Sequence, residues 1–246
     1  LHISVAALDI GPGDEVITTP ITFCATANAA LYQGVDVKFV DIDKNTLNID
    51  PDLIEEKITE RTKAIMPVHM YGHPVDMDPV LALARDRGLV VVEDAAQVHG
   101  AEYKGRKCGS LGHVSAWSFY ANKIVTTGEG GMVLTSDDAM AERAASYRNL
   151  CFRADRRFYH TEFGYNFRMS NLQGALGVAQ VERIEEFVTI KRRVGHLYRA
   201  RLAAIPGVRF QVEEAWAKCV YWMYCIELDT ELGFKADDAR RALAER

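Results

Sequence analysis

The chain has 246 residues, of which 48% are hydrophobic and 26% charged, and its formal net charge is -5. This is the ordinary composition of a globular protein. An acidic chain without a basic stripe is not expected to bind nucleic acid or an anionic membrane surface. No apolar run approaches the roughly 20 residues that a membrane helix needs. The composition therefore argues against both kinds of partner.

The five cysteines are scattered through the sequence, and no two of them form a C-x-x-C pair. They are Cys24, Cys108, Cys151, Cys219 and Cys225. An odd number of scattered cysteines is not typical of a metal site or of a disulfide framework. We therefore expect no metal site, and a location in the reducing cytoplasm.

Strand-like and helix-like stretches alternate through the first hundred residues. Short apolar stretches predict strands at 15–19, 37–43, 63–69 and 89–96. Helices are predicted for the opening residues 1–13, for 25–33, for a segment that starts at 50–58, and for 77–88. Strand and helix in turn imply an α/β fold whose parallel sheet is covered on both faces. Ligands of such sheets bind beyond the carboxyl ends of the strands.

The pattern changes after residue 100. Strand-like stretches with short links occur at 101–109, 114–120 and 131–136. One long helical pattern then runs from Ser170 to about Ala204, and Pro206 and Gly207 break it. The stretch 219–228 predicts a strand that opens a second, smaller domain. We therefore expect a large domain over 1–204 and the beginning of a small domain over 205–246.

Both ends of the chain look like cut segments. Residues 1–13 are typical of the last turns of a helix, closed by Gly11, Pro12 and Gly13. The last twelve residues are typical of a helix that has barely started. The sequence is therefore expected to be the middle of a longer protein.

Lys123 lies in the stretch SFYANKIVTTGEGG and is isolated from other charges. Between Cys108 and Gly128 it is the only Asp, Glu, Lys or Arg. It is either an exposed loop lysine, as most lysines are, or a partly buried one with a lowered pKa. In the second case its neutral amine is a nucleophile that forms a Schiff base with an aldehyde or ketone.

Asp94 follows four apolar residues in the stretch VVVEDAAQVHG. A buried strand that ends in Glu93 and Asp94 places a carboxylate at the edge where ligands bind. The alternative is a helix cap or a surface acid. A Schiff-base lysine together with a carboxylate for a pyridinium nitrogen indicates a pyridoxal 5'-phosphate site. Ser118 then offers a donor to the phosphate, and Phe23 an aromatic face for the ring.

Four stretches of the sequence, in order, resemble one family of proteins. They are GPGDEVITTPITFCATANAA, VVVEDAAQVHGAEYKGRKCGSLG, SFYANKIVTTGEGGMVLTSDD and FGYNFRMSNLQGALGVAQVERIEEF. They look like the DegT/DnrJ/EryC1/StrS family of sugar aminotransferases, which use pyridoxal phosphate. The resemblance implies the aspartate-aminotransferase type of fold (fold type I), with a mostly parallel sheet between helices in the large domain.

The resemblance implies a role for each matching residue. Lys123 matches the lysine that bonds to the cofactor and moves the proton, and Asp94 matches the partner of the pyridine nitrogen. Gln97 lies where the family has a group that contacts the hydroxyl of the cofactor ring. Ser118 matches a phosphate ligand, and Phe23 matches the aromatic residue that stacks on the ring. In addition, Asn166 matches an asparagine that reaches the phosphate of the neighbouring subunit. A site built in this way implies a homodimer.

Other polar residues near these motifs have two interpretations each. Glu129 is either close to the substrate or only orders its turn, and His160 either reaches the sugar or serves its own loop. The histidines His69, His73 and His99 resemble family positions near the site, but we favour a structural role for them. Trp117 alternates with Ser118 along its strand and is expected in the core.

The resemblance also implies the substrates. The family moves an amino group from glutamate to a nucleotide-linked keto sugar, and these motifs are most similar to the branch that aminates carbon 4 of a GDP-linked 4-keto-6-deoxymannose. Branches that use UDP or dTDP sugars share most of the residues. The alternatives are a pyridoxal phosphate sugar dehydratase, whose relatives carry histidine in place of Lys123, and a non-catalytic regulator that binds sugar nucleotide or cofactor.

Two parts of the family pattern have no counterpart in this sequence. The family carries, upstream of the position of Leu1, a helix whose N-terminal amides hold the cofactor phosphate. Most of the C-terminal domain has no counterpart either. We therefore expect residues 1–246 alone to bind pyridoxal phosphate poorly, to be inactive and to expose apolar surface.

Overall fold

Six strands between residues 15 and 135 form one sheet in the computed structural model, which describes residues 1–245. Its strands are β1 Glu15–Thr18, β2 Asp36–Phe39, β3 Thr62–Ile65, β4 Val90–Asp94, β7 Val114–Ser118 and β8 Gly131–Thr135, in the order β2-β1-β3-β4-β7-β8. Neighbouring strands are parallel except β7 and β8, which are antiparallel. The predicted α/β fold with a mostly parallel sheet is therefore confirmed.

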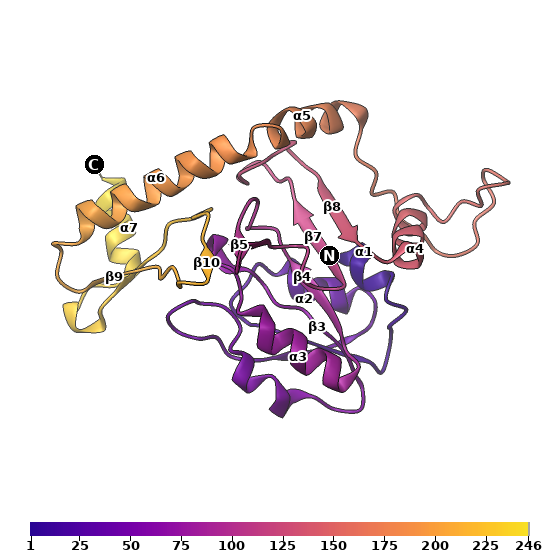
Figure 1. Ribbon diagram of the computed structural model, residues 1–246, viewed down its shortest axis with the longest axis horizontal. Coiled ribbons are helices and arrows are strands. Elements are labelled where there is room, and N and C mark those ends of the chain that lie inside the picture. Colours follow the sequence, from indigo (N-terminus) through magenta and orange to yellow (C-terminus); the bar gives the residue numbers. More distant parts are fainter. Residues whose placement is uncertain (246) are drawn as a thin grey trace.

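Helices lie on both faces of this sheet (Figure 1). The α-helices are α1 His2–Ala6, α2 Ala25–Leu31, α3 Met77–Arg87, α4 Asp138–Arg148, α5 Asn171–Val181, α6 Ile184–Leu202 and α7 Ala236–Ala244. Alternation along the strands separates two cores. Val16 and Val92 pack on the side of α1 and α2, whereas Ile17 and Val91 pack on the side of α3. Which face a strand residue occupies is thus set by its place in the sequence.

The remaining strands form two small sheets. The strands β5 Glu102–Tyr103, β6 Arg106–Lys107 and β10 Ala217–Lys218 form one, and β9 Val208–Phe210 pairs with β11 Ile226–Leu228 in the other. Val188 of α6 and Val220, which follows β10, are buried in the same core as Ile17. The chain beyond α6 therefore returns to pack against the first sheet. No helix in the described residues is long and apolar enough to cross a membrane.

Two of the predicted elements differ in the structure, and one helix was not predicted. The segment 50–58 forms two single 3-10 turns, Pro51–Leu53 and Glu55–Lys57, because buried Ile54 is fixed in the core and Ile58 is already extended toward β3. The predicted strand 219–228 is a strand only at its last three residues. Helix α4 was not predicted, although Asp137 caps it by accepting from the Met140 N–H.

The long helical pattern from Ser170 to Ala204 is interrupted. Ser170 caps α5 as expected, in a capping box with Gln173. The chain leaves helical geometry at Arg183, whose guanidinium bonds Glu186 in the first turn of α6. The two helices pack on different partners, α5 on the loop around Thr127 and α6 on the core. They therefore follow one another along the top of Figure 1 as separate elements.

Candidate active site at the carboxyl end of the sheet

The two acids at the end of β4 point to opposite faces of the sheet. Glu93 shares its face with Val91, and Asp94 shares its face with Val92. In β7 the residue paired with Asp94 is Ala116, so Ser118, two positions further on, lies on the same face as Asp94. The alternation of the strands thus assigns Asp94 and Ser118 to one face and removes Glu93 from it.

Glu93 is a structural carboxylate. It is fully buried, and its oxygens accept the backbone N–H of Gly109, Leu111 and Gly112 together with a bond from His69 Nε2 at 2.9 Å. Burial acts to raise the pKa of Glu93, but the bond to His69 and these amides outweigh it and hold that pKa below its usual range. The other ring nitrogen, Nδ1 of His69, accepts the Val75 N–H. The structural role of His69 remains our interpretation of these contacts.

Asp94 is held from the amino end of α2. Its Oδ2 accepts a bond of 2.7 Å from the Thr26 hydroxyl, which in turn lies 2.8 Å from the hydroxyl of Thr22. Its Oδ1 accepts the Ala96 N–H. Phe23 lies between the two threonines in the chain, and its ring is 72% exposed. The hydrogen bonds of the two threonines therefore tie the backbone around Phe23 to Asp94, and the Phe23 ring stays accessible to a ligand.

Lys123 lies in the loop that joins β7 to β8. The base of this loop is closed by Phe119, which donates to Gly130 O and accepts from Thr127 N–H. Val125 is fully buried and anchors the loop in the protein. Gly130 has a φ of 154°, and an added Cβ there would meet the Thr127 hydroxyl at 2.5 Å. The glycines of the motif thus permit a tight return to β8.

The amine of Lys123 is half-buried. Its Nζ lies 3.6 Å from the centre of the Trp222 ring, and it makes no ion pair within the described residues. Burial lowers the pKa of Lys123 to about 8, whereas the negative charge of Asp94 acts to raise it. The amine therefore has a substantial neutral fraction near pH 8, as a nucleophile requires.

Gln97 and Ser118 are both engaged by the backbone. The buried Gln97 accepts the Tyr71 N–H at 2.6 Å, and its Nε2 reaches only the sulfur of Met70, at 3.8 Å. The Ser118 hydroxyl accepts the Tyr120 N–H at 3.3 Å. The amide nitrogen of Gln97 and the hydroxyl proton of Ser118 therefore remain available as donors.

Asn166 and His160 belong to an exposed loop between α4 and α5. Asn166 Oδ1 accepts a bond of 2.9 Å from Arg168, and its backbone bridges to Asn149. His160 Nδ1 lies 2.7 Å from the Leu150 carbonyl, and its ring packs on Phe152. None of these contacts reaches Lys123 or Asp94, so this chain does not bring the two groups of predicted residues together.

Glu129 contributes its backbone to the structure. Its carbonyl accepts bonds from the Thr127 hydroxyl and from Gln173 Nε2, both at 2.8 Å. Its side chain is exposed, and no polar contact of the carboxylate occurs in the described residues. Glu129 thus orders its turn, while its carboxylate stays free for a ligand.

The histidines and Trp117 have different surroundings. His73 is buried, contacts Pro74 O and accepts the Glu214 N–H. His99 is also buried, between Trp117 and Phe119, yet neither of its ring nitrogens has a hydrogen-bond partner in residues 1–245. Burial, and secondarily the charge of Lys123, lower the pKa of His99 to about 4.

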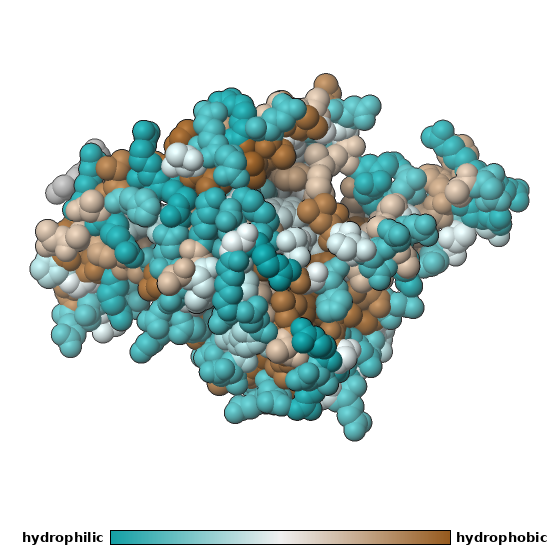
Figure 2. All heavy atoms as spheres, viewed as in Figure 1, coloured by the Kyte–Doolittle hydropathy of each residue, from teal (hydrophilic) through white to brown (hydrophobic). Residues whose placement is uncertain are grey.

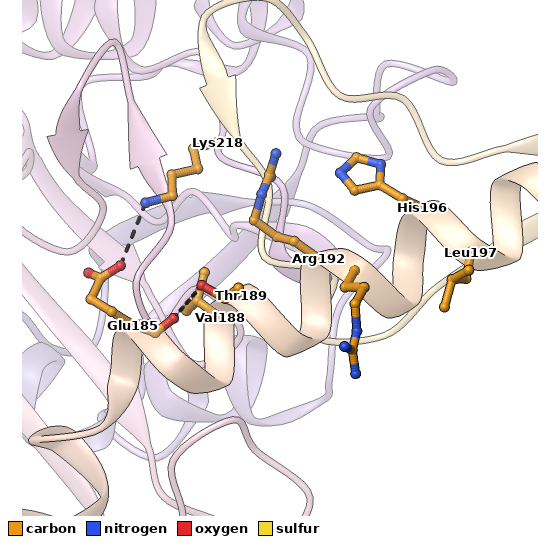
Figure 3. A pocket seen from close by; sticks show the side chains of 8 residues that line it. Glu185, Val188, Thr189, Arg192, His196, Leu197 and Lys218 are labelled. Atoms are coloured by element: carbon orange, nitrogen blue, oxygen red, sulfur yellow. Dashed lines mark hydrogen bonds and ion pairs between the residues drawn. The ribbon is translucent and has the colours of Figure 1, made fainter.

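A cavity of about 530 Å³ lies away from these residues, between α6 and β10 (Figure 3). Two of its three lysine and arginine side chains are in ion pairs: Lys218 bonds Glu102 and approaches Glu185, and Arg192 bonds Glu213. None of the predicted site residues lines it. It is therefore a cleft on the α6 side, separate from the residues at the end of the sheet.

The residues at the carboxyl end of the sheet fit pyridoxal phosphate. Asp94 is buried, and the two bonds described above leave its charge without a cationic side-chain partner in the described part of the chain. A buried carboxylate of this kind favours a cation or a charged N–H. The pyridinium N–H is such a group, and the Lys123 amine is the nucleophile that its aldehyde needs.

Two residues of this region were not predicted from the sequence. Thr26 bonds Asp94, and its place one helical turn after Thr22 is a signal that could have been found. Trp222 covers Lys123 from a point 99 residues further along the chain. No local pattern predicts a contact of that separation.

The comparisons with known proteins agree with this geometry. The whole chain, residues 1–246, matches the model of the DegT/DnrJ/EryC1/StrS aminotransferase family. It is 43% identical over 244 residues to a GDP-perosamine synthase of Caulobacter vibrioides, covering 99% of this chain and 66% of that protein. It is 38% identical over 246 residues to a GDP-perosamine synthase of Escherichia coli O157:H7, covering 100% and 66%.

A solved structure of S. venezuelae DesV in complex with a ketimine intermediate has the same fold. It superposes with a TM-score of 0.93 at 35% identity, covering 100% of this chain and 64% of that one. The chain spans about two thirds of the length of the relatives it matches. The match over all its residues nevertheless shows that this chain belongs to the DegT/DnrJ/EryC1/StrS aminotransferase family.

Proposed function

We propose that the protein containing this chain is a pyridoxal phosphate-dependent aminotransferase. The observation that carries the proposal is the pair formed by Lys123 and Asp94. Lys123 has a half-buried amine whose pKa is lowered to about 8, and the negative charge of buried Asp94 acts on it. Asp94 has no cationic side-chain partner among residues 1–245. The amine is a nucleophile for the aldehyde of pyridoxal phosphate, and the carboxylate is a partner for its pyridinium N–H.

Each residue then has a defined task. When bound, pyridoxal phosphate supplies an electron sink for the carbon that loses its proton. The Lys123 amine holds the cofactor covalently and, once released, accepts and returns that proton at Nζ. Asp94 keeps the ring nitrogen protonated, with Thr26 fixing its carboxylate. Phe23 packs on the ring, Gln97 donates to the ring hydroxyl, and Ser118 donates to the phosphate.

The names of two relatives support a proposal for the substrates. Two of them are named GDP-perosamine synthase, at 43% and 38% identity. We therefore infer that this enzyme moves the amino group of glutamate to carbon 4 of a GDP-linked 4-keto-6-deoxymannose, a step in making sugars for a surface polysaccharide or a natural product. His160 and Glu129 are the residues proposed for contact with the sugar.

A panel of sugars tests this proposal. The full-length polypeptide that contains residues 1–246 is incubated with glutamate and with GDP-, UDP- or dTDP-linked 4-keto-6-deoxy sugars, and products are identified by mass spectrometry. Amination of the GDP sugar, with conversion of glutamate to 2-oxoglutarate, is the expected result. Amination of only a UDP or dTDP sugar would keep the reaction class and overturn the substrate.

Two other functions predict different products. A dehydratase would remove a hydroxyl group without adding nitrogen, and the presence of lysine at position 123 disfavours it. A regulator that binds only the sugar nucleotide would stay colourless with pyridoxal phosphate, whereas a lysine-bound cofactor makes the protein yellow. The colour of the purified full-length protein, followed by its loss on borohydride reduction and the mass of the Lys123 peptide, separates these cases.

We also propose that the active unit is a homodimer. The exposed face of α5 carries Leu172 and Leu176, which are 80% and 56% exposed, and apolar atoms gather over this helix in Figure 2. In the neighbouring loop Phe163 is 86% exposed. A second copy that covers these side chains would bring Asn166 to the phosphate in the partner's site.

A further inference from the structure

The indole of Trp222 covers the Lys123 amine. Its ring centre lies 3.6 Å from Nζ, and its Nε1–H donates to the Asn122 carbonyl at 2.8 Å. One side chain thus contacts both the amine and the backbone immediately before it. A small cavity of about 240 Å³ adjoins this contact and is lined by Asn122, Lys123, Ile124, Phe187, Ile190, Lys191 and Trp222.

The backbone that carries Trp222 is held in an uncommon conformation. Tyr221, the preceding residue, has a φ of 47°, which is costly for an aromatic residue. Its hydroxyl donates to Glu213 Oε2 at 3.0 Å, and Val220 N–H donates to Gly72 O at 3.0 Å. Residues in such conformations persist only where the surroundings over-determine them.

Close contacts on two sides fix the backbone of residues 219–222. A Cβ added at Gly72, where φ is 97°, would lie 2.8 Å from the Trp222 nitrogen, so the two backbones meet at a distance that only glycine permits. On the other side, Arg192 of α6 bonds both Glu213 and the Cys219 carbonyl. Helix α6 and the Gly72 turn together fix Trp222 over Lys123.

We propose that Trp222 is a positioning residue of the site, which covers the Lys123 amine, excludes water from it and, through the Asn122 carbonyl, fixes the backbone that carries it. The inference rests on the proposed function for its use in catalysis. Two effects of the indole oppose one another. Its face attracts an ammonium ion and so favours the charged form of Lys123, whereas removal of water favours the neutral amine.

The net direction is set by water exclusion, because burial is the dominant influence on Lys123 and lowers its pKa. Three other titratable groups face this amine from the elements packed around it. They are Asp94 at the end of β4, His99 below the loop, and Lys191 of α6, whose own pKa is lowered by burial. A substitution of Trp222 leaves all three in place, so a change in the titration of Lys123 reports on the indole.

Competitive acetylation tests the proposal on the full-length polypeptide without cofactor. The rate of modification of each lysine is measured against pH by mass spectrometry, which gives the titration midpoint of Lys123. The midpoint is expected near 8 in the wild type. In Trp222→Ala it should rise by about one pH unit or more, toward the ordinary lysine value. In Trp222→Phe, which keeps a ring over the amine, it should stay within about half a unit.

Ile190→Ala is the matched control, because it enlarges the same cavity and leaves the indole in place. Its midpoint should equal that of the wild type. If Trp222→Ala does not fold by circular dichroism, Trp222→Gln replaces it, because glutamine admits water and keeps side-chain length. An unchanged Lys123 midpoint in the folded variant, or an equal rise in Ile190→Ala, would overturn the proposal.

The outcome is separable from that of the proposed function. Capture of pyridoxal phosphate and amination of sugar are measured on the wild type, whereas the acetylation midpoint requires neither. A wild type that aminates no sugar, together with a raised midpoint in Trp222→Ala, would reject the function and support the role of the indole. Normal amination with an unchanged midpoint would do the reverse.

Discussion

The end of the sheet and the loop between α4 and α5 contribute predicted site residues in different ways. At the end of the sheet the side chains of Asp94 and Gln97 are buried, and each is held by hydrogen bonds within this chain. In the loop, Phe158 and Phe163 are 75% and 86% exposed, and Asn166 is exposed as well. One region is fixed by its own chain, whereas the other presents apolar side chains to the outside.

This difference follows from the backbone. A parallel sheet covered by helices fixes the direction of every side chain at its edge, because neighbouring strands share hydrogen bonds along their length. The loop has no ladder of this kind: its isolated bridges join Asn149 to Asn166 and Phe152 to His160, with scattered backbone bonds such as that from Thr161 N–H to Cys151 O. Its exposed aromatic side chains are therefore held less firmly by this chain than the side chains at the end of the sheet. The four predictions below test how firmly each region is held by its own chain.

The largest effect is expected for Lys123→Ala. Loss of the only amine at this position should remove covalent capture of pyridoxal phosphate and lower turnover roughly 10⁴-fold or more. Absorbance of the bound cofactor and the rate of sugar amination measure the two losses. Lys44→Ala, at an exposed turn, is the control. Lys123→Ala protein that stays yellow and active would show that another lysine serves the cofactor.

Next comes the pair of neighbouring acids in β4. Asp94→Asn keeps the shape and the bond from Thr26 but loses the charge, so turnover should fall roughly 10²–10³-fold while cofactor still binds. Glu93→Gln should instead cost about 1–3 kcal/mol of unfolding free energy, because an amide cannot accept all the N–H groups that Glu93 serves. Denaturant melts and kinetics distinguish them. Equal kinetic losses would contradict the assignment of opposite faces.

The next effect appears only at acidic pH and concerns the stability of the fold. The pKa of His99 is about 4 in the folded protein and has its ordinary value near 6.5 when unfolded. Between these values the unfolded chain binds the extra proton, so stability is lost as pH falls from 6.5 to 4, on the order of 3 kcal/mol. His99→Leu should flatten this part of the profile in denaturant melts between pH 4 and 7. A variant as acid-sensitive as the wild type would assign the loss to other groups.

The smallest effect on stability is expected in the exposed loop. Asn166→Ala should change the unfolding free energy by less than about 0.5 kcal/mol and yet impair turnover. Mixed with Lys123→Ala, it should form heterodimers with one intact site, and activity should partly return. Lys123→Ala mixed with Asp94→Asn is the control, because each site of that heterodimer carries one defect. No recovery in the first mixture, despite proven subunit exchange, would place Asn166 in its own chain's site or in the fold.

The sequence allowed the sheet and its ends to be predicted because alternation and turn residues are local signals. The strands β4 and β7 end at Asp94 and Ser118, inside the stretches for which strands were predicted. Ser170 caps α5, as its position before the helical pattern indicated. The break at Arg183 was missed, because the apolar pattern continues across it and only the different partners of the two helices separate them.

Contacts between segments that are far apart in the sequence could not be predicted either. The turn at Gly72 and helix α6 set the position of Trp222, and neither lies near it in the chain. His99 was expected to be a structural histidine with its hydrogen bonds satisfied, but its two ring nitrogens have no partner in the described residues. That property depends on the rings of Trp117 and Phe119, which only the folded chain places around it.

The buried Glu93 has a consequence for how this fold varies among sequences. Its carboxylate accepts hydrogen bonds from the backbone N–H groups of Gly109 and Gly112 and bonds His69. Neither glycine has room for a side chain. An added Cβ would lie 2.2 Å from Trp117 at Gly109 and 2.9 Å from the Val91 carbonyl oxygen at Gly112. Replacement of Glu93 or His69 leaves buried polar groups without a partner, and replacement of either glycine creates a steric clash. In an alignment, these four positions should therefore covary as one block, whichever sugar a given sequence accepts.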